Sequence, residues 1–80
     1  MYEPSIDEIS QVEKAFTYHA PFGDHPDRYQ RLREDARDLA LHIITSCPPS
    51  RERSLALTNL QQAIMWANAA IACNEIPEKE

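Results

Sequence analysis

Four arginines lie close together in the sequence, at positions 28, 31, 33 and 37. If this stretch is helical, each side chain can pair with residues three or four positions away. Arg28 then has Asp24 nearby, though in the preceding loop. Arg31 has Asp27 within reach and Arg37 has Glu34, whereas Arg33 has no acidic residue. A guanidinium without a carboxylate partner suits phosphate, which can accept both hydrogen bonds of its fork. Arg33 is therefore a candidate anion-binding residue; the alternative is an ion pair with a carboxylate of another helix or subunit.

Aromatic side chains precede the arginines, at Phe16, Tyr18 and Phe22. An exposed tyrosine can stack on a nucleobase and stabilise its binding by ~1–3 kcal/mol. We expect Phe16 and Phe22 to close one end of a helical core. For Tyr18 two roles stay open, packing in that core or stacking on a ligand.

The sequence contains no pattern typical of a catalytic or metal site. His19, His25 and His42 lack metal-ligand spacing with either cysteine, and no HExxH, GxSxG or glycine-rich phosphate loop occurs. We expect His25 and His42 to be ordinary loop or helix residues. These observations predict a protein that is not an enzyme and has no metal and no cofactor.

The eighty residues carry eight Lys and Arg against thirteen Asp and Glu, which gives a net charge of −5. An acidic protein of this size is not expected to bind DNA, RNA or anionic membranes in general. No apolar run reaches the ~20 residues of a membrane span, and no leader is recognisable. A single glycine argues against a sheet with tight turns. The composition predicts one small cytosolic helical domain.

The spacing of apolar residues predicts three helices, over about 5–17, 26–46 and 50–75, with a frayed tail at 77–80. Ser5 and Ser50 are suited to cap the first and third helices. Pro48 and Pro49 end the second helix, and the short turn that follows predicts an antiparallel αα-hairpin. The predicted fold class is all-α: a single domain, 1–80, in which a short N-terminal helix packs on a long hairpin.

The third predicted helix lacks charge over 21 residues, from Ser54 to Asn74. A surface helix in a monomer normally carries a charged outer stripe. One interpretation is an alanine-rich helix whose amides face water. The other is burial on two faces, one within the hairpin and one between subunits, with Met65 and Trp66 supplying apolar contact area. The second interpretation predicts a homo-oligomer, which would also supplement the small core of one chain.

Several runs of residues fit one family pattern. They are Phe-Thr-Tyr-His-Ala-Pro at 16–21, Tyr29 with Leu32 and Arg33, Cys-Pro-Pro-Ser-Arg-Glu at 47–52, Leu-Ala-Leu-Thr-Asn-Leu at 55–60 and Met-Trp-Ala-Asn-Ala-Ala-Ile-Ala at 65–72. Together they resemble the hairpin domain shared by two phage immune-evasion sponges, the anti-CBASS cyclic-nucleotide sponge and the Thoeris-evading sponge for cyclic ADP-ribose isomers. The resemblance covers about residues 5–75, and the short chain makes the anti-CBASS type the closer match.

The resemblance implies a homohexamer that sequesters bacterial signalling cyclic oligonucleotides without cutting them, in the cytoplasm of the infected host. CBASS effectors would then not be activated. It also implies that cyclic dinucleotides lie in pockets between protomers, where a loop aromatic stacks on a base and a basic residue holds phosphate. By position, Tyr18 matches the aromatic and Arg33 the basic residue. His19 could reach the edge of the ligand, and Arg37 is a further ligand-binding candidate.

One position departs from the family pattern. Members often read Ala-Arg-Asn near the end of the third helix, where this chain has Ala72, Cys73 and Asn74. The family's second site, for cyclic trinucleotides, draws on basic residues from that region, and Cys73 supplies no positive charge. Arg51 or Arg53 of a neighbouring subunit is an alternative source of charge, so the sequence leaves trinucleotide binding open.

Two other classes of function are compatible with the sequence. One is a helical protein-interaction inhibitor whose acidic surface occupies a basic site on a host protein. The other is an oligomerisation module that binds no ligand. Binding of cyclic dinucleotides at micromolar concentration would distinguish the sponge from both.

Overall fold

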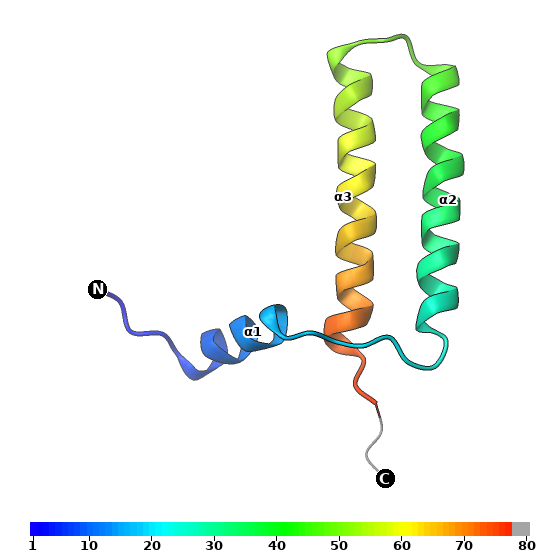
Figure 1. The fold of residues 1–80 in the computed structure, drawn as a ribbon. Coiled ribbons are helices and arrows are strands. Elements are labelled where there is room, and N and C mark those ends of the chain that lie inside the picture. The colour runs from blue at the N-terminus through cyan, green and yellow to red at the C-terminus, as the bar shows by residue number, and fades with distance from the viewer. Residues whose placement is uncertain (78–80) are drawn as a thin grey trace.

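The computed structural model describes residues 1–77, in which three helices and no strands are found (Figure 1). The helices are α1 (Ile6–Phe16), α2 (His25–Ser46) and α3 (Arg51–Asn74). The two long helices lie side by side and antiparallel, joined by a short loop at one end (Figure 1). The predicted all-α class is therefore confirmed. The predicted frayed tail falls outside the described residues, apart from Pro77.

The turn of the hairpin is held by polar groups that satisfy both helix ends. Ser50 Oγ accepts the backbone N–H of Arg53 at 3.1 Å and so caps α3, as predicted. The Arg53 guanidinium reaches back and donates to the carbonyl oxygens of Ile44 and Cys47, both at 3.2 Å. The last carbonyls of a helix have no partner within the helix, so this arginine completes the end of α2.

The seam between the long helices is apolar but incompletely enclosed. Its side chains are half-buried rather than buried, and are Leu32, Ala36, Ala40 and Ile43 of α2 and Leu57, Leu60, Ile64, Ala67 and Ile71 of α3. No hydrophobic side chain in residues 1–77 is fully buried. The radius of gyration is 17.2 Å, against the about 12 Å of a compact domain of this length. Two helices alone do not enclose a core.

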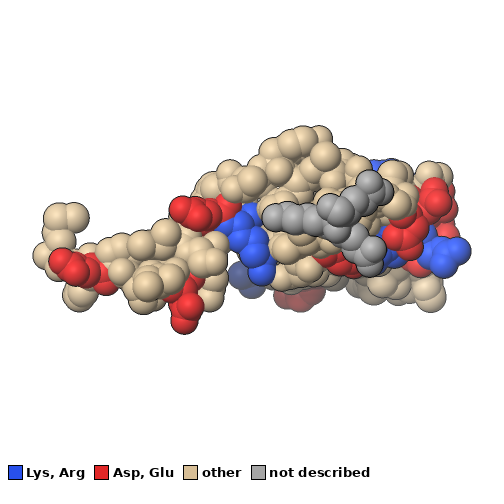
Figure 2. Space-filling view, turned by 90° about the horizontal axis from the view of Figure 1, so that it is seen from below, with Lys and Arg blue, Asp and Glu red and all other residues tan. Residues whose placement is uncertain are grey.

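The expectation that the first helix packs on the hairpin is wrong for the single chain. Helix α1 extends sideways from the end of the hairpin, as Figures 1 and 2 show, with acidic residues along the projecting arm. Its apolar stripe is uncovered: Ile6 and Phe16 are each 86% exposed. Phe16 therefore does not close the core, whereas Phe22 is half-buried and packs against His25 with ring centroids 4.1 Å apart. Periodicity identified the apolar face of α1, but it does not show whether another surface of the same chain covers that face.

Local signals explain why α1 is nevertheless a helix. Ser5 Oγ accepts the Glu8 N–H at 3.1 Å, and the Glu8 carboxylate accepts the Ser5 N–H at 2.9 Å. This reciprocal capping box satisfies two N–H groups at the helix start. The backbone hydrogen bond from Ser5 is the main reason why the pKa of Glu8 lies below its usual value. The far end of α1 is tied to α3 because Lys14 Nζ donates to Asn74 Oδ1 at 2.7 Å.

The outward surface of α3 carries no charged residue from Ser54 onwards. Trp66 is 74% exposed, and Met65 beside it is exposed as well. Within residues 1–77, none of the helices combines the length and apolar character needed to cross a membrane.

Removing the cap of α3 tests the account of the hairpin turn. In Ser50→Ala the Arg53 N–H loses its acceptor, and we expect the free energy of unfolding to fall by about 1 kcal/mol. Ser54→Ala, one turn further along the same helix, is the matched control and should have little effect. Urea unfolding at one fixed protein concentration measures both. Equal losses in the two variants would contradict a capping role for Ser50.

Candidate functional site

An open cavity lies where the loop before α2 meets the last turns of α3. We call it the loop cavity; its volume is about 400 Å³, within the range of small-molecule sites. Its lining combines aromatic, basic and amide groups with small residues of α3, and consists of Tyr18, His19, Pro21, Tyr29, Arg33, Asn68, Ala69 and Ala72. Three of the four predicted ligand-binding residues, Tyr18, His19 and Arg33, thus line one cavity.

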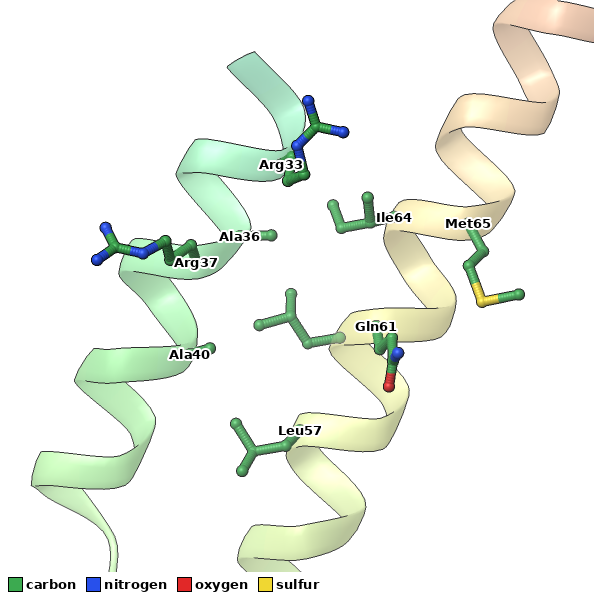
Figure 3. A pocket seen from close by; sticks show the side chains of 9 residues that line it. Arg33, Ala36, Arg37, Ala40, Leu57, Gln61, Ile64 and Met65 are labelled. Atoms are coloured by element: carbon green, nitrogen blue, oxygen red, sulfur yellow. The ribbon is translucent and has the colours of Figure 1, made fainter. Parts of the chain in front are cut away.

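A second hollow, the hairpin groove, lies along the seam between α2 and α3. Its volume is about 460 Å³ and its lining is mostly apolar, with Arg33, Ala36, Arg37, Ala40, Leu57, Leu60, Gln61, Ile64 and Met65. Figure 3 shows the small side chains of Ala36 and Ala40 facing α3, which leaves room between the helices. Arg37 lies here and not in the loop cavity. Its guanidinium turns away from α3 (Figure 3) and its Nη1 lies 3.8 Å from Asp38 Oδ1.

The loop from Thr17 to Asp24 presents Tyr18 and His19 to the cavity. The Tyr18 side chain is 84% exposed, so its ring has a face free for contact. The imidazole of His19 is anchored because Nε2 donates to the Lys14 carbonyl at 2.8 Å. Gly23 makes the turn into α2 with φ at +57°, a conformation that side chains disfavour.

Two polar groups of the loop cavity, the Arg33 guanidinium and Asn68 Oδ1, have no protein partner in the described residues. Arg33 forms no ion pair within residues 1–77, as its helical neighbours predicted. No carboxylate is among the lining residues. Asn68 Oδ1 is buried without a hydrogen-bond partner in the described structure. Sequence reasoning noticed Asn68 only as one of several amides on α3, since its spacing alone does not place it at a cavity.

A polar cluster behind the loop cavity joins the start of α2 to the end of α3. Arg28 binds Glu75 through both terminal nitrogens, with Nη1 donating to Oε2 at 2.8 Å and Nη2 to Oε1. Arg28 Nε also lies 3.1 Å from Asp24 Oδ1, the pairing that the sequence suggested. His25 Nε2 donates to Glu75 Oε1 at 3.1 Å. We call His25, Arg28 and Glu75 the end cluster.

Sequence reasoning missed the end cluster. His25 was expected to be an ordinary residue, yet it is 2% exposed and the only buried side chain in residues 1–77. Glu75 lies 47 residues beyond Arg28, so no local spacing connects them. The available signal was topological: in an antiparallel hairpin, an acid at the end of one helix lies near bases at the start of the other.

The electrostatics of the end cluster follow from its hydrogen bonds. The hydrogen bonds from Arg28 are the main cause that lowers the pKa of Glu75 to about 2. Burial opposes them, and the hydrogen bond from His25 lowers the pKa by a smaller amount. The pKa of Arg28 rises further above its usual value, chiefly through the same bonds to Glu75. Both side chains are more than one-third exposed, so solvent screens this pair.

Comparison with models of known protein families shows which family the chain belongs to. The model of the Acb2/Tad1 hairpin domain matches residues 8–72, which is 65 of the 80 residues. The chain belongs to the Acb2/Tad1 hairpin family. These are anti-CBASS and anti-Thoeris sponges, so the resemblance found in the sequence is confirmed. A search of curated proteins and a search of solved structures each returned no match.

The matched range of this Acb2/Tad1 hairpin includes the whole loop cavity and most of the hairpin. Tyr18, His19, Arg33 and Arg37 all fall within it. Glu75 lies beyond residue 72, so the end cluster joins the matched domain to a residue outside the match.

The lowered pKa of Glu75 predicts how the Acb2/Tad1 hairpin responds to acid. The Glu75 carboxylate titrates near 4.5 when unfolded and near 2 when folded, so its stabilising contribution is complete above about pH 4.5 and is lost towards pH 2. We therefore expect Glu75→Gln to be less stable than the wild type at neutral pH and the difference to shrink across this window. Thermal unfolding at a series of pH values measures it.

Other carboxylates also titrate in this window, so a control for the loss of one negative charge is needed. Glu3→Gln makes the same change at an exposed residue without a hydrogen-bond partner in the described structure. Its stability should follow that of the wild type. A difference between Glu75→Gln and the wild type that stays constant from neutral pH to pH 2 would contradict the assignment.

Proposed function

We propose that this protein sequesters cyclic dinucleotides of bacterial immune signalling without cleaving them, so that CBASS effectors are not activated. It would act in the cytoplasm of the infected bacterium. One observation carries the proposal: Arg33, which has no ion-pair partner in residues 1–77, and the exposed ring of Tyr18 line one open cavity in an Acb2/Tad1 hairpin.

The residues of the loop cavity suit the chemistry of a nucleotide. The Tyr18 ring stacks on a base, and the Arg33 guanidinium donates two hydrogen bonds to a phosphate. Asn68 Oδ1, buried without a partner, offers an acceptor for an N–H or O–H of the ligand once the side chain turns towards it. His19, anchored through Nε2, contacts the ligand's edge.

Binding without cleavage is supported by what lines the cavity. None of its lining residues is a carboxylate or a cysteine, and the imidazole of His19 is already bound to a backbone carbonyl. No group of three His, Cys, Asp or Glu side chains in residues 1–77 is arranged to hold a metal ion. These features favour a site that holds an anion over one that activates water.

The proposal includes assembly into a homohexamer, the state that the family resemblance implies. A cyclic dinucleotide has two bases and two phosphates, so a two-fold related pair of loop cavities satisfies both halves of the ligand. The uncovered stripe of α1 and the exposed Met65 and Trp66 support assembly, because large exposed apolar side chains of this kind mark contact sites. In such an assembly the ligand lies between protomers.

Arg37, unlike Tyr18, His19 and Arg33, does not line the loop cavity. It borders the hairpin groove with its guanidinium turned outward, so it contacts a ligand only if a neighbouring protomer brings the ligand to it. For cyclic trinucleotides, Arg53 is already committed to the end of α2 in its own chain. Arg51, which is exposed, is therefore the candidate to replace the charge that Cys73 does not supply.

Substitution of the two central residues tests the proposal. We expect Tyr18→Ala and Arg33→Ala each to weaken binding of a cyclic dinucleotide by at least about tenfold, because a stack or a charged hydrogen-bond pair is lost. Both variants should assemble as the wild type does, since both side chains are exposed. Calorimetric titration with cyclic di-AMP, cyclic di-GMP and mixed cyclic GMP–AMP measures the affinity.

Matched controls exist within the chain. Tyr2→Ala removes another exposed tyrosine, and Arg31→Ala removes an arginine of α2 that lines neither hollow. Neither should change the affinity. If a cavity variant binds as tightly as its control, that residue's assignment is wrong. If the wild type binds no cyclic dinucleotide at micromolar concentration, the sponge is wrong and a protein-interaction inhibitor or a ligand-free module is favoured.

A further inference from the structure

We propose that the end cluster positions the loop from Thr17 to Asp24 for ligand capture, which makes Arg28 and Glu75 positioning residues of the loop cavity. This inference rests on the proposed function, because it assigns the cluster a role in binding the same ligand. The observations that carry it are the burial of His25 and the way in which both ends of the loop are tied to one end of α3.

His25 is held by two hydrogen bonds and two neighbouring aromatic rings. Its Nδ1 accepts the backbone N–H of Phe22 at 3.3 Å, which leaves the ring proton on Nε2 to be donated to Glu75. The Phe22 ring packs against the imidazole with ring centroids 4.1 Å apart, and the Tyr29 ring lies near it with centroids 5.8 Å apart. With 2% of its surface exposed, the imidazole acts as the local core of this end of the hairpin.

The contacts of His25 lead directly to the loop cavity. Tyr29 lines the cavity, and Phe22 follows Pro21, which also lines it. The hydrogen bond from Phe22 N–H to His25 therefore fixes the backbone immediately after the cavity wall. Because His25 is also hydrogen-bonded to Glu75, this part of the loop is connected to the end of α3.

The other end of the loop is tied to the neighbouring residue of α3. Lys14 Nζ donates to Asn74 Oδ1 at 2.7 Å, and the Lys14 carbonyl accepts from His19 Nε2 at 2.8 Å. Asn74 and Glu75 are consecutive, so two adjacent residues hold the two ends of the segment that presents Tyr18. The two routes are independent, because one runs through α1 and the other through α2.

This arrangement matters because the loop has no apolar core to fix it. Tyr18 itself is exposed and makes no hydrogen bond within the described residues, so its position depends on the backbone on either side. If the binding-competent fraction of loop conformations falls tenfold, the apparent affinity falls tenfold. Loss of the end cluster should therefore weaken ligand binding although no residue of the cluster lines the cavity.

Glu75→Gln in the full chain tests the inference. It keeps the size of the side chain but removes the charge that Arg28 and His25 share. Using the cyclic dinucleotide that the wild type binds most tightly, we expect about tenfold weaker binding, unchanged helical circular dichroism and unchanged sedimentation. The backbone amide resonances of Tyr18 and His19 in the free protein should shift, whereas that of Leu57, far along the hairpin, should not. Glu3→Gln is the control for net charge.

The outcomes separate this inference from the proposed function. If the wild type binds and an assembled Glu75→Gln binds equally tightly, the positioning role is overturned and the sponge stands. If the wild type does not bind, the proposed sponge function is overturned. In that case the amide resonances still test the positioning role, which is overturned if those of Tyr18 and His19 are unchanged in Glu75→Gln. If Glu75→Gln alters sedimentation, Arg28→Lys, which keeps a cation beside Glu75 without the two-pronged bond, is measured in the same way. Wild-type affinity or altered sedimentation in that variant also overturns the inference.

Discussion

A pair of antiparallel helices has one apolar seam and no third layer to cover it, and the rest of this structure follows from that limit. Along α2 and α3 the seam residues stay half-buried, and the stripe of α1 is uncovered. Small domains already bury a low fraction of their surface, and this chain spreads over a radius of gyration of 17.2 Å. In the proposed assembly, other copies of the chain would cover the exposed apolar surface and bring two loop cavities to one ligand.

Side-chain hydrogen bonds hold the two ends of the hairpin, where there is little apolar packing. At the turn, Arg53 donates a hydrogen bond to a carbonyl at the end of α2. At the open end of the hairpin, Glu75 accepts hydrogen bonds from Arg28 and His25. Beside it, Asn74 accepts one from Lys14. Hydrogen bonds at exposed sites contribute little free energy each, but they are directional. They therefore fix geometry at the end of the hairpin where the loop cavity lies, which is where a binding site needs precision.

The sequence predicted the parts of this structure that depend on local interactions. Helix spacing, the caps at Ser5 and Ser50 and the lack of an acidic neighbour for Arg33 all involve residues within four positions of one another. The position of α1 depends on a distant surface, and there the prediction failed. Arg28 shows both cases: its contact with Asp24 was visible in the sequence, whereas its stronger one with Glu75 was not. The hydrogen-bonding state of Asn68 likewise depends on packing that spacing does not encode.

The central claim is that copies of this chain hold an intact cyclic dinucleotide between them. Native mass spectrometry of the wild type mixed with the tightest-binding cyclic dinucleotide tests it most directly. We predict an oligomer whose mass includes uncleaved ligand, with fewer ligands than protomers because each ligand is shared by two loop cavities. A single chain without ligand, or an oligomer that releases cleaved nucleotide, would contradict the claim.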